Sequence, residues 1–250
     1  MAIHRKSLFT GQILYFRHMP PKTNLDSASE YRPLSPPFKD APRHMCSMYF
    51  YWWAFLRENE EYISCCKNGG EGPMEKLYRD FGDVSGTDFM DWWIDRGRLL
   101  FCEPLEDASV ILTEIPRKHD NESRVLISVP IHGDIDRIVA EIRSGMGEYQ
   151  GARGNKERPE SRARYQPLAT AKLQSLHRQL GVYQAKKKGI GHKTIAHDLD
   201  IGNSGRNYNE NAIVSAVSRY YAEACAIVRN VGKGRFPDYS DMTEEPDLFG

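Results

Sequence analysis

The sequence lacks several features that would assign it to a specialised class of protein. It has no run of roughly 18 uncharged apolar residues, so we expect no transmembrane helix and no membrane partner. Its first 21 residues lack the apolar core and cleavage site of a signal peptide, so we expect a cytoplasmic location. The 5 cysteines contain no C-x-x-C spacing, so neither a disulfide framework nor a zinc ribbon is expected.

Motifs of the common catalytic classes are also missing. There is no G-x-S-x-G or H-E-x-x-H motif, and the turn at residues 82–86 lacks the lysine of a phosphate-binding loop. His192 and His197 are separated by a spacing that places them about 140° apart around a helix, not on one face. We therefore predict no catalytic residues, no metal and no cofactor, and keep a metal-dependent nuclease as a remaining alternative.

The overall composition is that of a globular protein. With 40% hydrophobic residues among 250, the chain is long enough for one large domain or two small ones, and we expect two. The expected fold class is mostly α with a small β-hairpin (α+β). The first part, residues 1–43, is expected to be an extended arm because it is rich in proline. Its prolines are Pro20, Pro21, Pro33, Pro36, Pro37 and Pro42.

An aromatic-rich α+β domain is predicted over residues 44–147. Apolar spacing indicates helices at about 45–68, at about 73–81, and after a cap at Thr87 or Asp88. These helices carry all four tryptophans. We expect the tryptophans to form a core, because large aromatic side chains contribute mainly through burial, with a stacking platform for bases as the alternative.

Two β-rich runs and one further helix complete this domain. Residues 109–116 and 123–130 predict a hairpin or two neighbouring strands. A helix beginning at Asp134 has four aliphatic residues on one side and ends at glycines. These aliphatic residues are Ile135, Ile138, Val139 and Ile142.

Positive charge is concentrated after this domain, although the chain as a whole has no net charge. Residues 151–194 contain eleven lysines and arginines but only two glutamates. Residues 148–164 are predicted to be a basic linker. Binding to a polyanion releases condensed counterions in proportion to the basic residues brought close, so this segment indicates either a nucleic-acid partner or a solvated linker followed by a lysine-rich helix end.

Three helices are predicted between residues 165 and 234. The first, near residues 170–187, has leucines and a tyrosine on one face, and the short second helix begins near residue 192. In the second helix Ile195, Ala196 and Leu199 are expected to point inward, with Ile201 in the turn. A polar stretch at residues 202–209 precedes a third helix. The residues on the first face are Leu173, Leu176, Leu180 and Tyr183.

Residues 193–201, with the sequence Lys-Thr-Ile-Ala-His-Asp-Leu-Asp-Ile, and the downstream helix resemble helix-turn-helix DNA-binding proteins of bacterial phages and mobile elements. The resemblance covers about a quarter of the chain. It implies a C-terminal three-helix domain in which the small Ala196 lets the next helix cross closely. The stretch at 202–209 is longer than the tight turn of that pattern, so it is either an expanded loop or itself a nucleic-acid contact.

We predict a protein that binds double-stranded DNA and regulates transcription or recombination. Arginine and asparagine suit base edges, while lysine and serine suit phosphates. The N-terminal aromatic domain is expected to contact a protein partner or a second copy of the chain. In the alternative, the helices are a docking surface in a larger nucleoprotein or defence-related assembly. The candidate nucleic-acid-binding residues are Arg162, Arg164, Lys186, Lys187, Lys188, Lys193, Asn203, Arg206, Asn207, Asn209, Ser215, Ser218 and Arg219.

The chain ends in an acidic segment, residues 235–250. We expect a solvated tail there, or alternatively a phosphate mimic that covers the basic surface when nucleic acid is absent.

Overall fold

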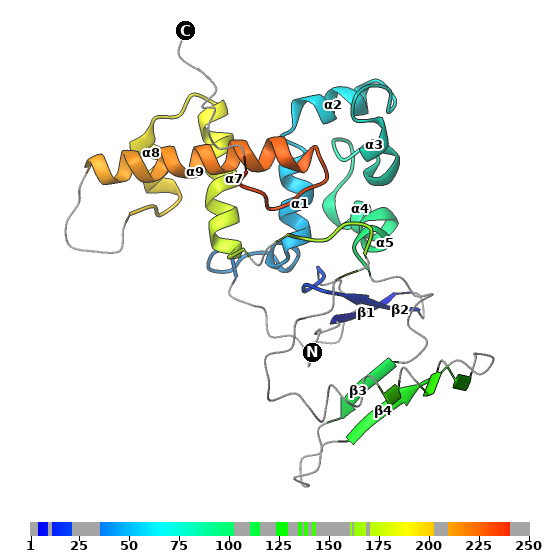
Figure 1. The fold of residues 1–250 in the computed structure, drawn as a ribbon. Coiled ribbons are helices and arrows are strands. Elements are labelled where there is room, and N and C mark those ends of the chain that lie inside the picture. Colours follow the sequence, from blue (N-terminus) through cyan, green and yellow to red (C-terminus); the bar gives the residue numbers. More distant parts are fainter. Residues whose placement is uncertain are drawn as a thin grey trace.

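The computed structural model describes twelve stretches of the chain. Within these stretches the chain is mostly helical (Figure 1). They are residues 5–9, 12–21, 36–102, 111–115, 124–129, 135–136, 138–139, 142–143, 161, 163–168, 171–202 and 210–240. The acidic tail beyond residue 240 and most of the basic linker therefore lie outside the described residues.

The first helical region is divided in two, which corrects the prediction of one helix over residues 45–68. After a 3-10 turn η2 (Arg43–Cys46), the chain forms α1 (Met48–Leu56) and then α2 (Glu60–Lys67). The division occurs because the side chain of Asn59 accepts a hydrogen bond from the backbone N–H of Tyr62 at 2.9 Å. An asparagine that caps a new helix in this way adopts extended backbone and so ends the preceding one.

The next helices follow the predicted order. Helix α3 (Glu75–Phe81) is followed by α4 (Phe89–Trp92), a π-helical turn η3 (Trp93–Gly97) and α5 (Arg98–Phe101). The predicted cap at Asp88 is confirmed, because its carboxylate accepts from the backbone N–H of Met90 at 2.8 Å.

Two antiparallel strand pairs lie beside the helices. Strand β1 (Arg5–Phe9) pairs with β2 (Gln12–Phe16), within the region predicted to be an extended arm. Strand β3 (Ile111–Ile115) pairs with β4 (Arg124–Ser128), with Ile111 opposite Ser128, in the two runs where the sequence indicates strands.

The main core is aromatic, as predicted. Trp52, Trp92 and Trp93 are at most 2% exposed, and Trp53 is 5% exposed. Trp93 also stacks on Phe101, with 6.1 Å between ring centroids and 17° between the planes. Because these rings are buried, the alternative of an exposed platform for base stacking is wrong.

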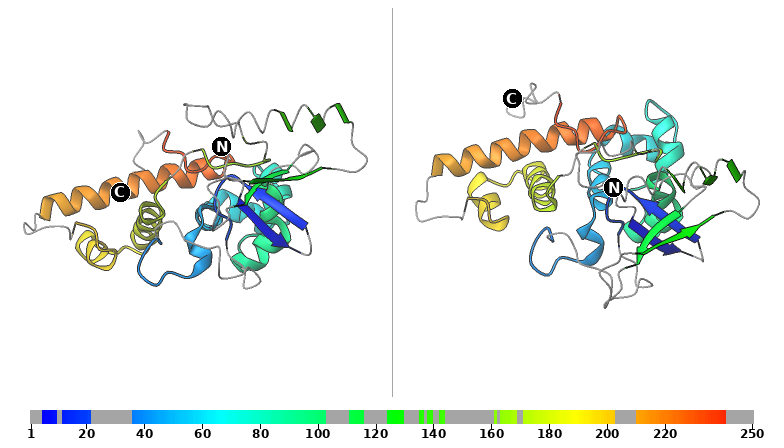
Figure 2. Two further views of the ribbon diagram at one scale, coloured as in Figure 1. Left: turned by 90° about the horizontal axis from the view of Figure 1, so that it is seen from below. Right: turned by 60° about the horizontal axis from the view of Figure 1, so that its bottom comes forward.

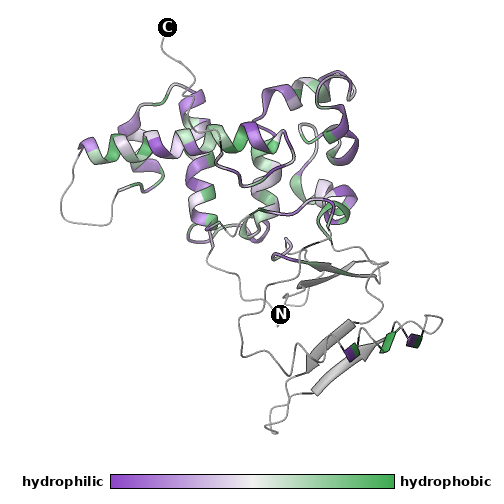
Figure 3. Ribbon diagram, in the orientation of Figure 1, coloured by the Kyte–Doolittle hydropathy of each residue, from purple (hydrophilic) through white to green (hydrophobic). Residues whose placement is uncertain are grey.

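Three further helices, α7 (Leu173–Lys187), α8 (His192–Asp198) and α9 (Glu210–Val231), correspond to the three helices predicted after the linker. In Figures 1 and 2, α9 extends from α8 at one end, past α7, to α1 at the other end. Figure 3 shows hydrophobic and hydrophilic residues alternating along α9, as expected of a helix with one buried face.

The packing does not divide at the predicted boundary of residues 148–164. The main cluster joins Trp52 and other N-terminal residues to Leu176 of α7 and Ile227 of α9. A smaller second cluster contains the other ends of these two helices and α8, including Val182 and Val217. Helices α7 and α9 therefore belong to both clusters.

Candidate nucleic-acid interface

Helices α7, α8 and α9 pack as one unit around the second cluster. Val182 of α7, Ile195 of α8 and Val217 of α9 are each at most 1% exposed within it. The guanidinium of Arg178 donates to the backbone carbonyls of Leu199 at 3.3 Å and Asp200 at 2.8 Å, which joins α7 to the end of α8. These contacts fix the position of α8 against the two long helices.

The residues expected to face inward around α8 do so. Ile195, Ala196 and Ile201 are all at most 5% exposed, and Leu199 is half-buried. A side chain at Gly181 of α7 would come within 2.9 Å of Leu199. Glycine inside a helix is unfavourable by about 1 kcal/mol relative to alanine, so the close approach of α8 explains its presence.

The N-terminal half of α9 has one polar face directed away from the cluster. Asn211 and Ser215 are exposed and Ser218 is half-buried, while Ile213 and Val217 face inward. Helical geometry places the three polar residues within about 60° of one another. They therefore lie on the side of the helix opposite Ile213 and Val217.

Several of the predicted cations are paired with acidic side chains of the chain itself. The Lys187 ammonium lies 3.0 Å from a carboxylate oxygen of Glu60 and 3.9 Å from one of Glu58. Across the second cluster, Lys193 lies 2.8 Å from Glu210 at the start of α9. The positive charge of this surface is thus partly balanced before any partner binds.

The other predicted cations of this unit lie in α7, directly after it, or in α9. Arg219 lies 3.8 Å from Glu223 and covers the ring of Tyr220. Lys186 lies over Tyr221, with 6.0 Å from its nitrogen to the ring centroid, and Lys188 is exposed after α7.

Arg164 is separated from this group. It forms an ion pair with the buried carboxylate of Asp80 in α3, which also accepts from the hydroxyl of Tyr165 at 2.7 Å. Figure 1 shows α3 and α8 at opposite ends of the helical part. Arg164 therefore attaches residues 163–168 to α3 and does not join the surface of α8 and α9.

Five of the predicted contact residues cannot be placed on this surface because they lie outside the described residues. They are Arg162, Asn203, Arg206, Asn207 and Asn209.

The histidines do not form a metal site in the part of the chain that the structure describes, where no group of three potential ligands occurs. Burial, and after it the charge of Lys186, lowers the pKa of His192 from its ordinary value. His192 is therefore uncharged at neutral pH and adds no positive charge to the start of α8.

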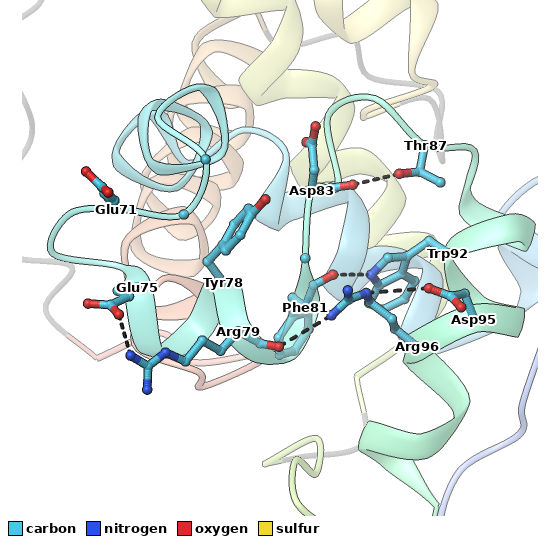
Figure 4. Close-up of a pocket in the computed structure, with 13 residues that line it drawn as sticks. Glu71, Glu75, Tyr78, Arg79, Phe81, Asp83, Thr87, Trp92, Asp95 and Arg96 are labelled. Carbon is cyan, nitrogen blue, oxygen red and sulfur yellow. Dashed lines mark hydrogen bonds and ion pairs between the residues drawn. The ribbon is translucent and has the colours of Figure 1, made fainter.

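A separate cavity of about 520 Å³ lies between the loop after α2, α3 and the π-helical turn (Figure 4). Four of its charged groups are paired with one another, because Arg79 pairs with Glu75 and Arg96 lies 3.5 Å from Asp95. Bonds from the Ser85 hydroxyl and backbone lower the pKa of Asp83, so this carboxylate is ionised and engaged in its own turn. The lining contains no histidine or cysteine and offers no pairing of a nucleophile with a base.

No known protein family, curated protein or solved structure matches the chain. Within the described stretches, every helix is too short or too polar to cross a lipid bilayer.

Proposed function

We propose that this protein binds double-stranded DNA through α8 and the N-terminal half of α9, as a regulator of transcription or recombination of the phage or mobile-element type. The observation that carries the proposal is the polar face of Asn211, Ser215 and Ser218 on a helix held from behind by α7 and α8. A helix of about 10–12 Å diameter fits the major groove, which is about 12 Å wide.

The electrostatic support comes from exposed cations on the same three-helix unit. Lys188 and Lys193 are exposed at the two sides of the α7–α8 turn, and Arg219 is exposed farther along α9. Partial pairing of Lys187 and Lys193 with glutamates predicts modest affinity, because phosphates must compete with those carboxylates. With about four phosphate contacts, the slope of log K against log salt concentration should be about −3 to −4.

Fluorescence anisotropy of a labelled random-sequence duplex, titrated at several salt concentrations, tests the proposal. Lys193→Ala should weaken binding and make the salt slope less steep by about 1. Lys67→Ala is the matched control, since Lys67 is exposed in the last turn of α2, away from α8. Absence of binding at about 50 mM salt would refute DNA binding.

A second variant tests the contacts between α9 and the bases. Ser215→Glu places a negative charge on the outward face of α9 without touching the second cluster. We expect it to abolish duplex binding and leave the thermal unfolding temperature unchanged, because a carboxylate in the groove is repelled by phosphates on both sides.

The second candidate is a protein-docking surface in a larger nucleoprotein or defence-related assembly. The observation in its favour is the neutralisation of Lys187 and Lys193 by Glu60 and Glu210. No duplex binding at low salt would favour this function, whereas metal-dependent cleavage of the same duplex would favour the nuclease alternative.

A further inference from the structure

The segment around residues 135–143 leaves aliphatic side chains uncovered. Its described parts, residues 135–136, 138–139 and 142–143, are helical. Ile135 is 75% exposed and Val139 is 38% exposed, while Ile138 and Ile142 are half-buried. Figures 1 and 2 show these parts at the periphery, away from α1, α7 and α9, and Figure 3 shows that they carry both hydrophobic and hydrophilic residues. An exposed aliphatic row of this kind is typical of an interaction surface.

In the helix that the sequence predicts from Asp134, the four aliphatic residues form a narrow row along one side. At about 100° per residue, positions 135, 138, 139 and 142 fall within an arc of about 100°. This arc is as wide as the buried stripe of an ordinary amphipathic helix, although here Ile135 and Val139 are exposed.

Two exposed charges of opposite sign flank the row. Asp136 and Arg143 are both exposed, and seven positions separate them. This spacing places them about 20° apart around the helix and about 10 Å apart along it. They therefore lie on the same flank of the row, the acid near its start and the base near its end.

This arrangement is complementary to itself. When two identical helices pack antiparallel about a two-fold axis, the same flank of each helix faces the other, and the start of one lies beside the end of the other. Asp136 of each copy then meets Arg143 of the other copy. The point halfway between Asp136 and Arg143 lies within one residue of the middle of the aliphatic row. The same alignment of the two helices therefore forms both the charge pairs and the aliphatic contact. A parallel pair would not bring these charges together.

We propose that the row Ile135, Ile138, Val139 and Ile142 is the dimer interface of this protein, covered by the same row of a second copy in antiparallel orientation. Four aliphatic side chains bury less than the about 800 Å² per partner of a standard stable interface, so the dimer dissociates at micromolar concentration. The inference does not depend on DNA binding. A two-fold dimer would also present two copies of α9, which suits a site with two half-sites.

Sedimentation equilibrium of the full chain without DNA, over about 1–100 µM, tests the interface. The wild-type protein should pass from the monomer mass of 28.7 kDa towards twice that mass as its concentration rises. Ile135→Glu should remove the dimer over this range. Glu71→Lys, at an exposed position in the loop after α2, is the control and should dimerise as the wild type does. A wild type that stays monomeric, or an Ile135→Glu variant that still dimerises, overturns the proposal.

Charge exchange tests the antiparallel register. Asp136→Arg alone and Arg143→Asp alone each create like-charge contacts at both ends of the interface, so each should weaken dimerisation by about tenfold. The double variant restores both attractive pairs and should recover the wild-type dissociation constant within about twofold. Failure of the double variant to recover overturns this pairing. Because both side chains are exposed, circular dichroism and thermal unfolding should match those of the wild type for all three proteins.

Discussion

Replacement of Asn59 by alanine removes two hydrogen bonds, one that caps α2 and one that joins the start of α2 to the end of α9. The Asn59 side chain is 6% exposed, accepts from the backbone N–H of Tyr62 at 2.9 Å and donates to the carbonyl of Val228 at 2.8 Å. Loss of a helix cap costs about 1 kcal/mol, and loss of a buried hydrogen bond costs about another 1 kcal/mol. We therefore expect the free energy of unfolding to fall by about 2 kcal/mol.

Two further substitutions at this position separate the contribution of the helix cap from that of the hydrogen bond to Val228. Asn59→Ser keeps an oxygen that can cap α2 but is too short to reach Val228, so it should cost about half as much as alanine. Asn59→Asp also keeps the cap, but it places a carboxylate against the Val228 carbonyl and should cost more than serine at neutral pH.

Urea unfolding followed by circular dichroism measures these differences. Asn68→Ala is the control, because Asn68 is exposed just after α2, and it should change the free energy of unfolding by less than about 0.5 kcal/mol. The reasoning is refuted by an Asn59→Ala variant as stable as this control, or by serine being as costly as alanine.

Three other substitutions test separate parts of the molecule. Ala196→Leu adds volume where Ala196 is 5% exposed and should lower the free energy of unfolding by about 1–3 kcal/mol in urea; wild-type stability would contradict close packing. The lowered pKa of Asp83 means that its ionised form stabilises the fold at neutral pH, and this contribution disappears as the pH falls through the folded-state pKa. The gap in unfolding temperature between wild type and Asp83→Asn should therefore shrink in acid; a constant gap would exclude the ionised form as its source. Glu60→Gln should strengthen duplex binding about two- to fivefold, because it releases Lys187 from its ion pair. An unchanged dissociation constant in the anisotropy titration would exclude competition between Glu60 and the phosphates for Lys187.

Local patterns were sufficient to predict most of the helices and their buried faces. Leu173, Leu176 and Leu180 recur at helical spacing and are buried, and Asp88 caps a helix as its position indicates. These features depend on neighbours within about one or two helical turns, which a sequence displays directly. The division at Asn59 also had a local signal, because Asn59 followed by Glu60 and Glu61 is a typical helix start, but the continuous aromatic spacing suggested one helix.

The electrostatics of the candidate interface could not be predicted in the same way. Lys187 and Glu60 are more than a hundred positions apart, and their ion pair exists only because α2 and α7 meet in the fold. Arg164 and Asp80 are likewise far apart in the sequence and meet only in the fold. Counting charges along the chain identified the basic segment, but not which of its cations the protein itself neutralises.

The 22 residues of α9 form a continuous helix about 33 Å long, with its first half in one apolar cluster and its second half in the other. A helix of this length resists bending, because bending would strain its ladder of backbone hydrogen bonds. Its orientation is therefore determined partly where its second half packs in the cluster of Trp52. A small rotation of α9 about Val228 would displace Ser215 much more than it displaces the residues next to Val228. The direction in which the outer face points thus depends on side chains far away from it.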